Sequence, residues 1–334
     1  MAIPGRGHKA KMYFARETTW GDSATCPNPE YTLEIISSSI TPELGMIEDP
    51  SLNDAVSRRN LYRGGQLARG NIVLRGNYEG LEELLYAATG TYAYSSSVHT
   101  FTEGAIPPSL VLWIKAGGVQ KNAADAYFRY LGAVVTSLTL RATAGTGTDA
   151  MLQAEFQFIC KSAEIVNVSN FSSVGNATPD VRPMLFHTAA VDNGVDTPTT
   201  TRVRSFEFKI ENQMAEDRFY FGSENIDQPL RSNFLTTSLQ MTQEFFNAES
   251  FDAGIDFSDC DVSATFTEAS PGLGEMYIHI PSAKLQSWST PVEGYGILIS
   301  TINYIGYYNA GISSSYELQL TSDTDELDEY VPNI

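Results

Sequence analysis

The sequence has few cysteines, and their spacing offers no crosslink. Cys26, Cys160 and Cys260 are the only three in 334 residues, and they lie far apart in the chain. An odd and widely spaced set provides neither a disulfide framework nor the short spacing of a metal-binding motif. We therefore expect buried free thiols and no metal site.

Catalytic motifs are also missing. The four histidines are scattered, and none belongs to a His-Glu-x-x-His arrangement. The segments GTGTDA at 145–150 and GYGILIS at 294–300 lack the residues that continue a phosphate-binding loop, so both indicate turns. There is no Gly-x-Ser-x-Gly nucleophile elbow, and carboxylates are too numerous to single out a catalytic pair. The sequence predicts a protein that is not an enzyme and has no cofactor.

Long apolar runs are absent as well. The N-terminal MAIPGRGHKAKMYFARE has basic residues but no apolar stretch of signal-peptide length, and no run of about 18 apolar residues occurs elsewhere. We expect a protein that is made in a cytoplasm, stays soluble and has no membrane partner.

Basic residues are scarce relative to acidic ones. There are 21 Lys and Arg against 40 Asp and Glu, which gives a formal net charge of -19. Such a surface repels phosphates, so the charge argues against a protein that grips nucleic acid, although not against one that DNA slides past. The hydrophobic fraction of 42% is enough for one or two folded domains.

Alternation of apolar and polar residues dominates the chain. In residues 201–212, Val203, Phe206, Phe208 and Ile210 fall mostly to one side, which is typical of a strand with one buried face. Similar runs, separated by Gly, Pro, Asn, Asp or Ser, predict a mainly β, antiparallel fold. The one helix expected covers Tyr78–Ala88 and ends near Gly90.

Long polar stretches suggest how the chain is divided. We expect loops at 41–70 and 214–233 that contact neighbouring subunits, because compact domains rarely keep long loops without a use. The predicted map is an N-terminal arm at 1–30, a first repeat at 31–166, a linker at 167–200, a second repeat at 201–320, and an acidic tail at 321–334.

The two predicted repeats share a pattern of strands. A strand, a long loop and another strand occur in each half, and LGAVVTSLTLRATAGTGTDAMLQAEFQFI at 131–159 is echoed by IPSAKLQSWSTPVEGYGILISTINYI at 280–305. Ala133 and Ser137 match Ala283 and Ser287. The alternatives are an internal duplication and a chance likeness between two strand-rich halves.

Several blocks of the chain resemble phage tail tube proteins. These are ARETTWGDSAT at 15–25, RGGQLARGNIVLRGNYEGLEELLYAATG at 63–90, YSSSVHTFTEGAIPPSLVLWI at 94–114 and IPSAKLQSWSTPVEGYG at 280–296. The resemblance lies in their shared order, and the chain is longer than the simplest single-fold tube proteins.

The resemblance implies a structural subunit of the virion tail. It implies a β-sandwich-like tube fold with a short helix, and rings that stack into a hollow conduit for genome delivery. With the internal duplication, the chain would hold two such folds in tandem. The implied partners are further copies of the chain, the tape measure protein, passing double-stranded DNA, and the tail terminator and tail tip proteins. Alternatives are a tail hub, a terminator, a capsid decoration protein or a carbohydrate-binding β-sandwich.

The width of duplex DNA limits the ring size. A barrel of roughly 24 strands, about 4.8 Å apart and tilted by about 40°, has a backbone diameter of roughly 48 Å and leaves roughly 35–40 Å inside. Duplex DNA, roughly 20 Å wide, would pass through it. Three duplicated chains or six single-fold chains satisfy this condition. The repeat favours a trimer with pseudo-sixfold symmetry.

The sequence gives candidate residues for a surface facing the lumen and for a contact between subunits. Acidic and small polar side chains facing the lumen would repel phosphates and prevent binding. The lumen candidates are Glu34, Ser38, Glu207, Glu211, Gln240, Thr242 and Glu244. The loop candidates for contact with an acidic neighbouring subunit are Arg58, Arg59, Arg63 and Arg69. The same lumen candidates would also suit the solvated face of an ordinary sandwich, and the acidic tail would suit either a solvated terminus or an arm.

Overall fold

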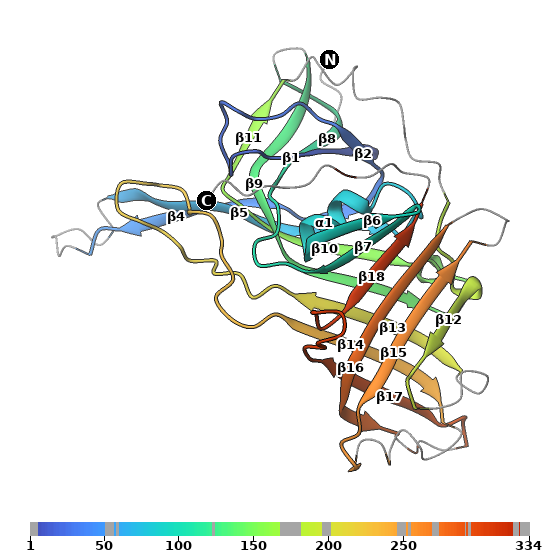
Figure 1. Ribbon diagram of the computed structural model, residues 1–334. Helices are drawn as coiled ribbons and strands as arrows, with labels where there is room; N and C mark the ends of the chain where they lie inside the picture. Colours follow the sequence, from blue (N-terminus) through green and yellow to red (C-terminus); the bar gives the residue numbers. More distant parts are fainter. Residues whose placement is uncertain are drawn as a thin grey trace.

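The computed structural model describes residues 6–50, 57, 60–121, 124–167, 182–195, 202–245, 252, 255–268, 274–290, 292, 295–322 and 327. It is built mainly from antiparallel strands with the helix α1 (Glu82–Thr89), as predicted (Figure 1). The helix ends at Gly90, whose φ of 96° is the left-handed conformation that glycine favours. No described helix is long and apolar enough to span a membrane.

The strands in chain order are β1 Arg6–Arg16, β2 Tyr31–Leu33, β3 Ile35–Ser38, β4 Thr41–Glu48, β5 Leu61–Arg75, β6 Gly90–Ser95, β7 Val98–Glu103, β8 Leu110–Lys121, β9 Ala124–Thr143, β10 Gln153–Cys160, β11 Ser162–Val166, β12 Ala189–Asp192, β13 Val203–Glu211, β14 Thr236–Glu244, β15 Cys260–Thr267, β16 Glu275–Ser289, β17 Ile299–Gly306 and β18 Glu317–Thr321.

Two long strands each take part in two groups of strands. The first part of β9 pairs with β8 and β11, and its second part pairs with β10 and β13. The first part of β16 likewise pairs with β15 and β18, and its second part pairs with β17. The second parts of both strands belong to one sheet of eight strands in the order β3–β5–β10–β9–β13–β14–β17–β16.

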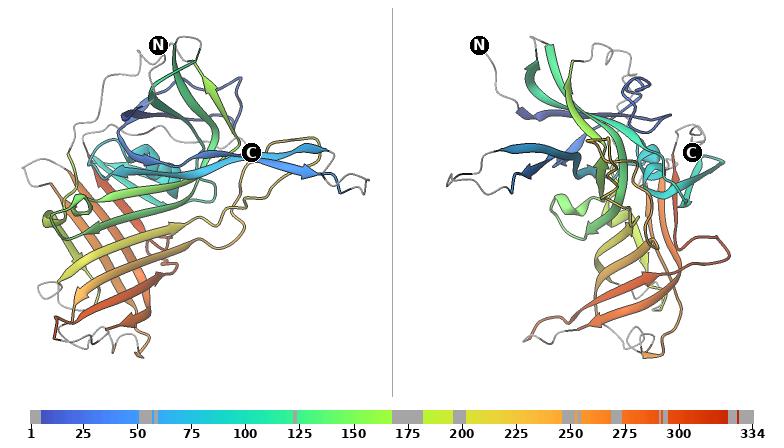
Figure 2. Two further views of the ribbon diagram at one scale, coloured as in Figure 1. Left: turned by 180° about the vertical axis from the view of Figure 1, so that it is seen from behind. Right: turned by 90° about the vertical axis from the view of Figure 1, so that its left-hand side faces the viewer.

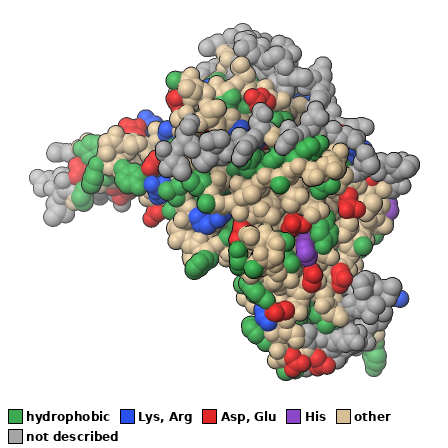
Figure 3. Space-filling model, viewed as in Figure 1, with side chains coloured by type: hydrophobic (Ala, Val, Ile, Leu, Met, Phe, Trp, Pro, Cys, Tyr) green, Lys and Arg blue, Asp and Glu red, His purple; other side chains and the backbone are tan. Residues whose placement is uncertain are grey.

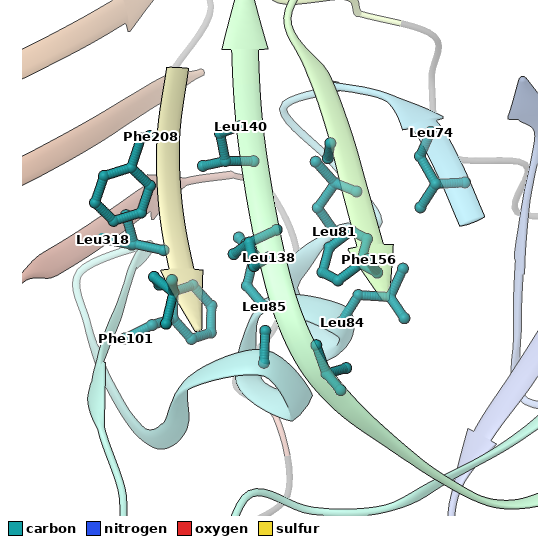
Figure 4. Packing of buried hydrophobic residues seen from close by; sticks show 14 of the residues in the cluster. Leu74, Leu81, Leu84, Leu85, Phe101, Leu138, Leu140, Phe156, Phe208 and Leu318 are labelled. Atoms are coloured by element: carbon teal, nitrogen blue, oxygen red, sulfur yellow. The ribbon is translucent and has the colours of Figure 1, made fainter. Parts of the chain in front are cut away.

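A single large core fills the space behind this sheet. Leu138, Leu140, Phe156 and Phe208 point from the sheet toward α1 and the strands on its other side (Figure 4). All four side chains are fully buried. Burial of apolar side chains on this scale is the main stabilising term of the fold. The predicted alternation of strand 201–212 is confirmed, because Phe206, Phe208 and Ile210 are buried in this core.

The strand pairings occur in two sets with the same connections. In the first set, β1, β3, β5, β8, β9, β10 and β11 pair as β1–β8, β8–β9, β9–β10, β9–β11, β10–β5 and β3–β5. In the second set, β12 to β18 pair in the corresponding way, as β12–β15, β15–β16, β16–β17, β16–β18, β17–β14 and β13–β14. We call these sets the first half and the second half.

The bulges in the two halves also correspond. The β3–β5 ladder shifts register at Ile36, and the β13–β14 ladder shifts at Arg204. The β9–β10 ladder shifts at Thr136, and the β16–β17 ladder shifts at Gln286. A bulge adds one unpaired residue and bends its strand, so its position marks a specific point of a fold. These registers bring Ala133 and Ser137 to the same places as Ala283 and Ser287.

The segment expected as a loop at 41–70 is instead a β-hairpin, so that prediction was wrong. Strands β4 and β5 form a ladder from Thr41 opposite Arg69 to Glu48 opposite Leu61. Its Gly, Pro and Arg content is typical of a loop. Because its side chains are mostly exposed, it also lacks the alternation of apolar and polar residues that marks a core strand. Together with residues 214–233, the hairpin forms an arm that projects from the body (Figure 2).

The segment expected as a linker, 167–200, contains ordered structure where it is described. Strand β12 pairs with β15, and Met184 is buried in the core. Residues 168–181 and 196–200 lie outside the described residues, as do most of the predicted acidic tail and the first five residues of the N-terminal arm.

Candidate functional site: a polar sheet face and an apolar arm

The eight-stranded sheet presents polar side chains on the face opposite the core. Residues that alternate with the buried phenylalanines of β13 point to this face, and their partners on β9 and β14 point the same way because paired residues share a face. One row across the sheet is Arg75, Gln153, Arg141, Glu207, Gln240, Asn303 and Ser287. A neighbouring row is Thr143, Ser205, Thr242, Thr301 and Ser289. We call this surface the polar face.

Five of the seven lumen candidates lie together on the polar face. They are Glu207, Glu211, Gln240, Thr242 and Glu244. Glu34 lies at the end of this surface, where its carboxylate is 3.4 Å from the guanidinium of Arg75. Ser38 is exposed but pairs with the buried Ile72, so it shares the face of the core and is not brought to the polar face.

Most carboxylates on the polar face have a cation beside them. Glu155 lies 3.6 Å from Arg141, and Glu211 is paired with Lys209. Arg204 donates a hydrogen bond of 2.7 Å to Glu244, and this contact is the main cause of the lowered pKa of that carboxyl. Glu207 faces Arg141 across the β9–β13 ladder. The local charge of this surface is therefore far closer to balance than the charge of the whole chain.

The arm brings together the two segments that the sequence indicated as long loops. The amide of Gln66 donates a hydrogen bond of 2.8 Å to the carbonyl of Glu224. Phe219 packs against Gly65, where a Cβ atom would lie 2.7 Å from the ring. A side chain at residue 65 would displace this ring, so the glycine permits the contact.

The arginines of the arm pair within the chain. Arg63 lies 3.4 Å from Glu224, and Arg69 lies 2.7 Å from Glu43 and 3.2 Å from Glu216. All three pairs are exposed, so each contributes at most about 1 kcal/mol. Their contact with another subunit stays a prediction. Arg58 and Arg59 lie outside the described residues.

Sequence analysis missed that the arm is apolar as well as basic. Large hydrophobic side chains are exposed along it, among them Leu44, Met46, Ile47, Leu61, Tyr62, Tyr220 and Phe221. Figure 3 shows hydrophobic side chains gathered on the arm. A cluster of this kind on a projecting element is typical of a contact surface. The signal in the sequence was Leu44, Met46 and Ile47 within a stretch otherwise rich in Gly, Pro and charge.

The block ARETTWGDSAT fixes a corner of the fold. The buried carboxylate of Glu17 accepts hydrogen bonds from the amides of Gly21 at 2.9 Å and Gly132 at 2.8 Å, and from the hydroxyl of Ser109 at 2.8 Å. Trp20 donates to the carbonyl of Gly132 at 3.2 Å. Gly132 has a φ of +63°, and it lies where β9 passes from one group of strands to the other. Burial raises the pKa of Glu17.

Titratable groups do not converge on a reaction centre in the described part of the chain. No group of three or more His, Cys, Asp or Glu side chains that could hold a metal occurs among the described residues. Cys160 and Cys260 are buried and Cys26 is half-buried, and all three are free thiols. The fold and its surfaces define a β-sheet protein whose distinctive features are an extended polar face and a projecting apolar arm.

Comparison with known proteins identifies the family to which this chain belongs. A model of the family described as phage tail tube protein matches residues 7–293. The chain therefore belongs to the phage tail tube protein family, as the sequence blocks indicated. Comparison with curated proteins gave no match.

Proposed function

We propose that copies of this tail tube subunit close into a ring whose polar faces line a lumen for double-stranded DNA. The single observation that carries the proposal is the eight-stranded sheet, in which the order β3–β5–β10–β9 is followed by the corresponding order β13–β14–β17–β16. An open sheet with a polar face on one side and the core on the other can continue from copy to copy into a barrel.

The matched pairings and bulges support an internal duplication of the tube fold. The bulge at Ile36 corresponds to the bulge at Arg204, and the bulge at Thr136 corresponds to the bulge at Gln286. A chance likeness between two strand-rich halves would not be expected to reproduce both positions. We assign the first tandem fold to 31–166 together with β1, and the second to 201–320 together with β12. One chain then supplies two of six similar positions in a ring.

Strand number favours three chains in each ring. Three sheets of eight strands give 3 × 8 = 24 strands, which is the barrel of roughly 48 Å expected above. Six chains would give 6 × 8 = 48 strands and a backbone diameter of roughly 96 Å, far wider than duplex DNA needs.

The ion pairs refine the expectation of an acidic lumen. Because Glu155, Glu211 and Glu244 lie beside cations, the polar face presents a smaller net negative field than a row of bare carboxylates would. Hydrated polar groups of balanced charge would still offer phosphates no cluster of cations to bind. Under this proposal the genome passes because nothing in the wall retains it.

The arm is proposed to contact neighbouring subunits in the same or an adjacent ring. Its exposed apolar residues and its projection from the body support this role. The tape measure protein within the lumen, and the terminator and tail tip proteins at the two ends of the tube, are the further proposed partners. Assembly is proposed to take place in the host cytoplasm and the tube to remain in the virion tail.

Electron microscopy of the purified protein tests this function. We expect discs or tubes with a central hole, threefold symmetry at high resolution and near-sixfold symmetry at low resolution. Solitary molecules at high protein concentration, or rings whose lumen is lined by the core side of the sheet, would contradict the proposal. A tail hub, terminator or decoration protein would form rings or monomers that do not stack repeatedly.

A further inference from the structure

The chain contains one junction between its two halves within the eight-stranded sheet. Strands β9 and β13 pair with Ser137 opposite Glu211, Thr139 opposite Lys209 and Arg141 opposite Glu207. The amide of Asn212 donates to the carbonyl of Thr136 at this junction. Behind the ladder, Leu138 and Leu140 pack with Ile210 and Phe208 in the core.

The outer strands of the sheet correspond to the two strands of this junction. Strand β16 corresponds to β9, with Ser287 in the place of Ser137 and Ser289 in the place of Thr139. The register of β3 and β4 on β5 is continuous, and it corresponds to that of β13 on β14. Counting from the matched bulges brings Thr41 to the place of Lys209 and Glu43 to the place of Glu211.

Positions that the internal junction buries are more open at these outer strands. Ser38 is exposed, whereas its counterpart Phe206 is buried. At the other end, Trp288 is only partly buried, and its counterpart Leu138 is fully buried.

An apolar groove runs beside the open edge of β3. It has a volume of about 970 Å³, and its walls include Ile35, Ile36, Ile40, Pro42, Phe128 and Ile165. The corresponding hollow in the second half is walled in part by Ala142 of β9, which is supplied by the first half of the same chain. The groove in the first half therefore lacks the strand that its counterpart receives.

We infer that β16 of one copy pairs with β3 and β4 of the next copy in the register of the internal β9–β13 junction. This inference rests on the proposed ring, and it names the contact that closes it. Ser289 then lies opposite Thr41, and Ser287 lies opposite Glu43. Trp288, on the core side of β16, lies beside Pro42 at the groove.

The residues at this junction suit a contact that forms between folded copies. Pro42 has no amide hydrogen, so one ladder hydrogen bond of the internal junction is not made here. Proline is tolerated at edge strands and discourages indiscriminate pairing of the exposed edge. The apolar groove and the large side chain of Trp288 offset this loss by burying surface.

Engineered disulfides test the register. Thr139 and Lys209 form a pair without ladder hydrogen bonds, for which Cα atoms lie about 4.5 Å apart, within the range of a disulfide. Under the inference, Ser289 of one copy and Thr41 of the next form a pair with the same geometry as Thr139 and Lys209. On oxidation of assembled rings, Ser289→Cys with Thr41→Cys should therefore give covalent dimers and trimers on non-reducing electrophoresis.

Three controls make the result specific. Thr139→Cys with Lys209→Cys should crosslink within one chain and leave its mass unchanged. Ser289→Cys with Glu43→Cys is out of register by one pair and should crosslink several times less. Ser289→Cys alone reports pairing with the native, half-buried Cys26.

The outcomes separate the register from the function. If microscopy shows rings and the internal pair crosslinks, but Ser289→Cys with Thr41→Cys yields only monomers or no more dimer than the out-of-register pair, the inferred junction is overturned and the tube function stands. If neither the native chain nor the variants form rings under any condition, the tube function fails, and the junction fails with it.

Discussion

The two halves of the chain share the same pairings but differ in what is attached to them. The first half carries α1, the β6–β7 hairpin and the β4–β5 hairpin, whereas the corresponding loop of the second half, 212–235, is largely irregular. The β4–β5 hairpin and this loop contact each other within the chain and form the arm. Under the proposed function, the shared strands would supply the wall of the tube, and the added elements would carry the specialised contacts.

Both halves bring charges of both signs to the polar face. The first half supplies Arg75 and Arg141 with Glu34 and Glu155, and the second supplies Lys209 and Arg204 with Glu207, Glu211 and Glu244. Cross-strand ion pairs on one face stabilise a sheet modestly, and opposite charges at the junction favour the correct neighbour. Under the proposed ring, the lumen would therefore carry nearly balanced charge in both halves of each chain.

The largest expected effect is on subunit stability, and it distinguishes the buried β9–β13 junction from the open edge of β16. Leu138→Ala removes a fully buried side chain from the internal junction and should lower the free energy of unfolding by about 2–5 kcal/mol. Trp288→Ala, at the corresponding open position, should cost the unassembled subunit less and should weaken ring formation instead. Urea unfolding of dilute subunit and sedimentation of concentrated subunit measure the two effects. Equal losses of subunit stability, with ring formation unchanged by Trp288→Ala, would show that the two positions do not correspond.

A second effect compares the two parts of the arm, the β4–β5 hairpin and the loop of the second half. Met46→Thr together with Ile47→Thr removes exposed apolar surface while keeping strand-forming residues, so stacking should be lost while subunit stability changes by no more than about 0.5 kcal/mol. Phe221→Ser, on the loop of the second half, should weaken stacking less. Tube length by electron microscopy is the measurement. Normal tubes from the Met46 and Ile47 variant would contradict the contact role of the arm.

A third effect concerns the acidic side of the polar face. Glu207→Lys together with Glu211→Lys converts a balanced surface into a cationic one, so we expect rings of normal appearance with slower DNA ejection. Binding of a short duplex to assembled tubes should become measurable, with a dissociation constant on the order of 10⁻⁴–10⁻⁶ M at physiological salt, and should strengthen steeply as the salt concentration is lowered. Glu216→Lys, on the arm, is the control and should leave DNA binding unchanged. Unaltered ejection and no DNA binding would argue that this face is not the lumen.

Strand alternation predicted the core strands of the sheet well because a buried face leaves a period-two pattern in the sequence. The strand at 201–212 and the correspondence of Ala133 with Ala283 are both evident in the sequence. The hairpin of the arm was not, because β4 and the first part of β5 bury neither face, and their glycines and arginines are typical of a loop. The ion pairs were not visible either, since which charges meet depends on registers that the bulges at Thr136 and Arg204 set.

The smallest expected effect tests how the two corners of the fold are held. The corner of β9 at Gly132 is fixed by Glu17, whereas the corresponding corner of β16 has Pro281 and Ser282. Burial raises the pKa of Glu17 above its unfolded value, so ionisation of this group costs the folded state stability at neutral pH. This penalty is relieved as the pH falls through the folded pKa toward the unfolded one. The difference in urea midpoint between the native chain and Glu17→Gln should therefore shift in favour of the native chain between pH 7 and pH 5. A difference that does not change with pH would mean that the folded and unfolded states bind the Glu17 proton equally in this range, and would contradict the raised pKa.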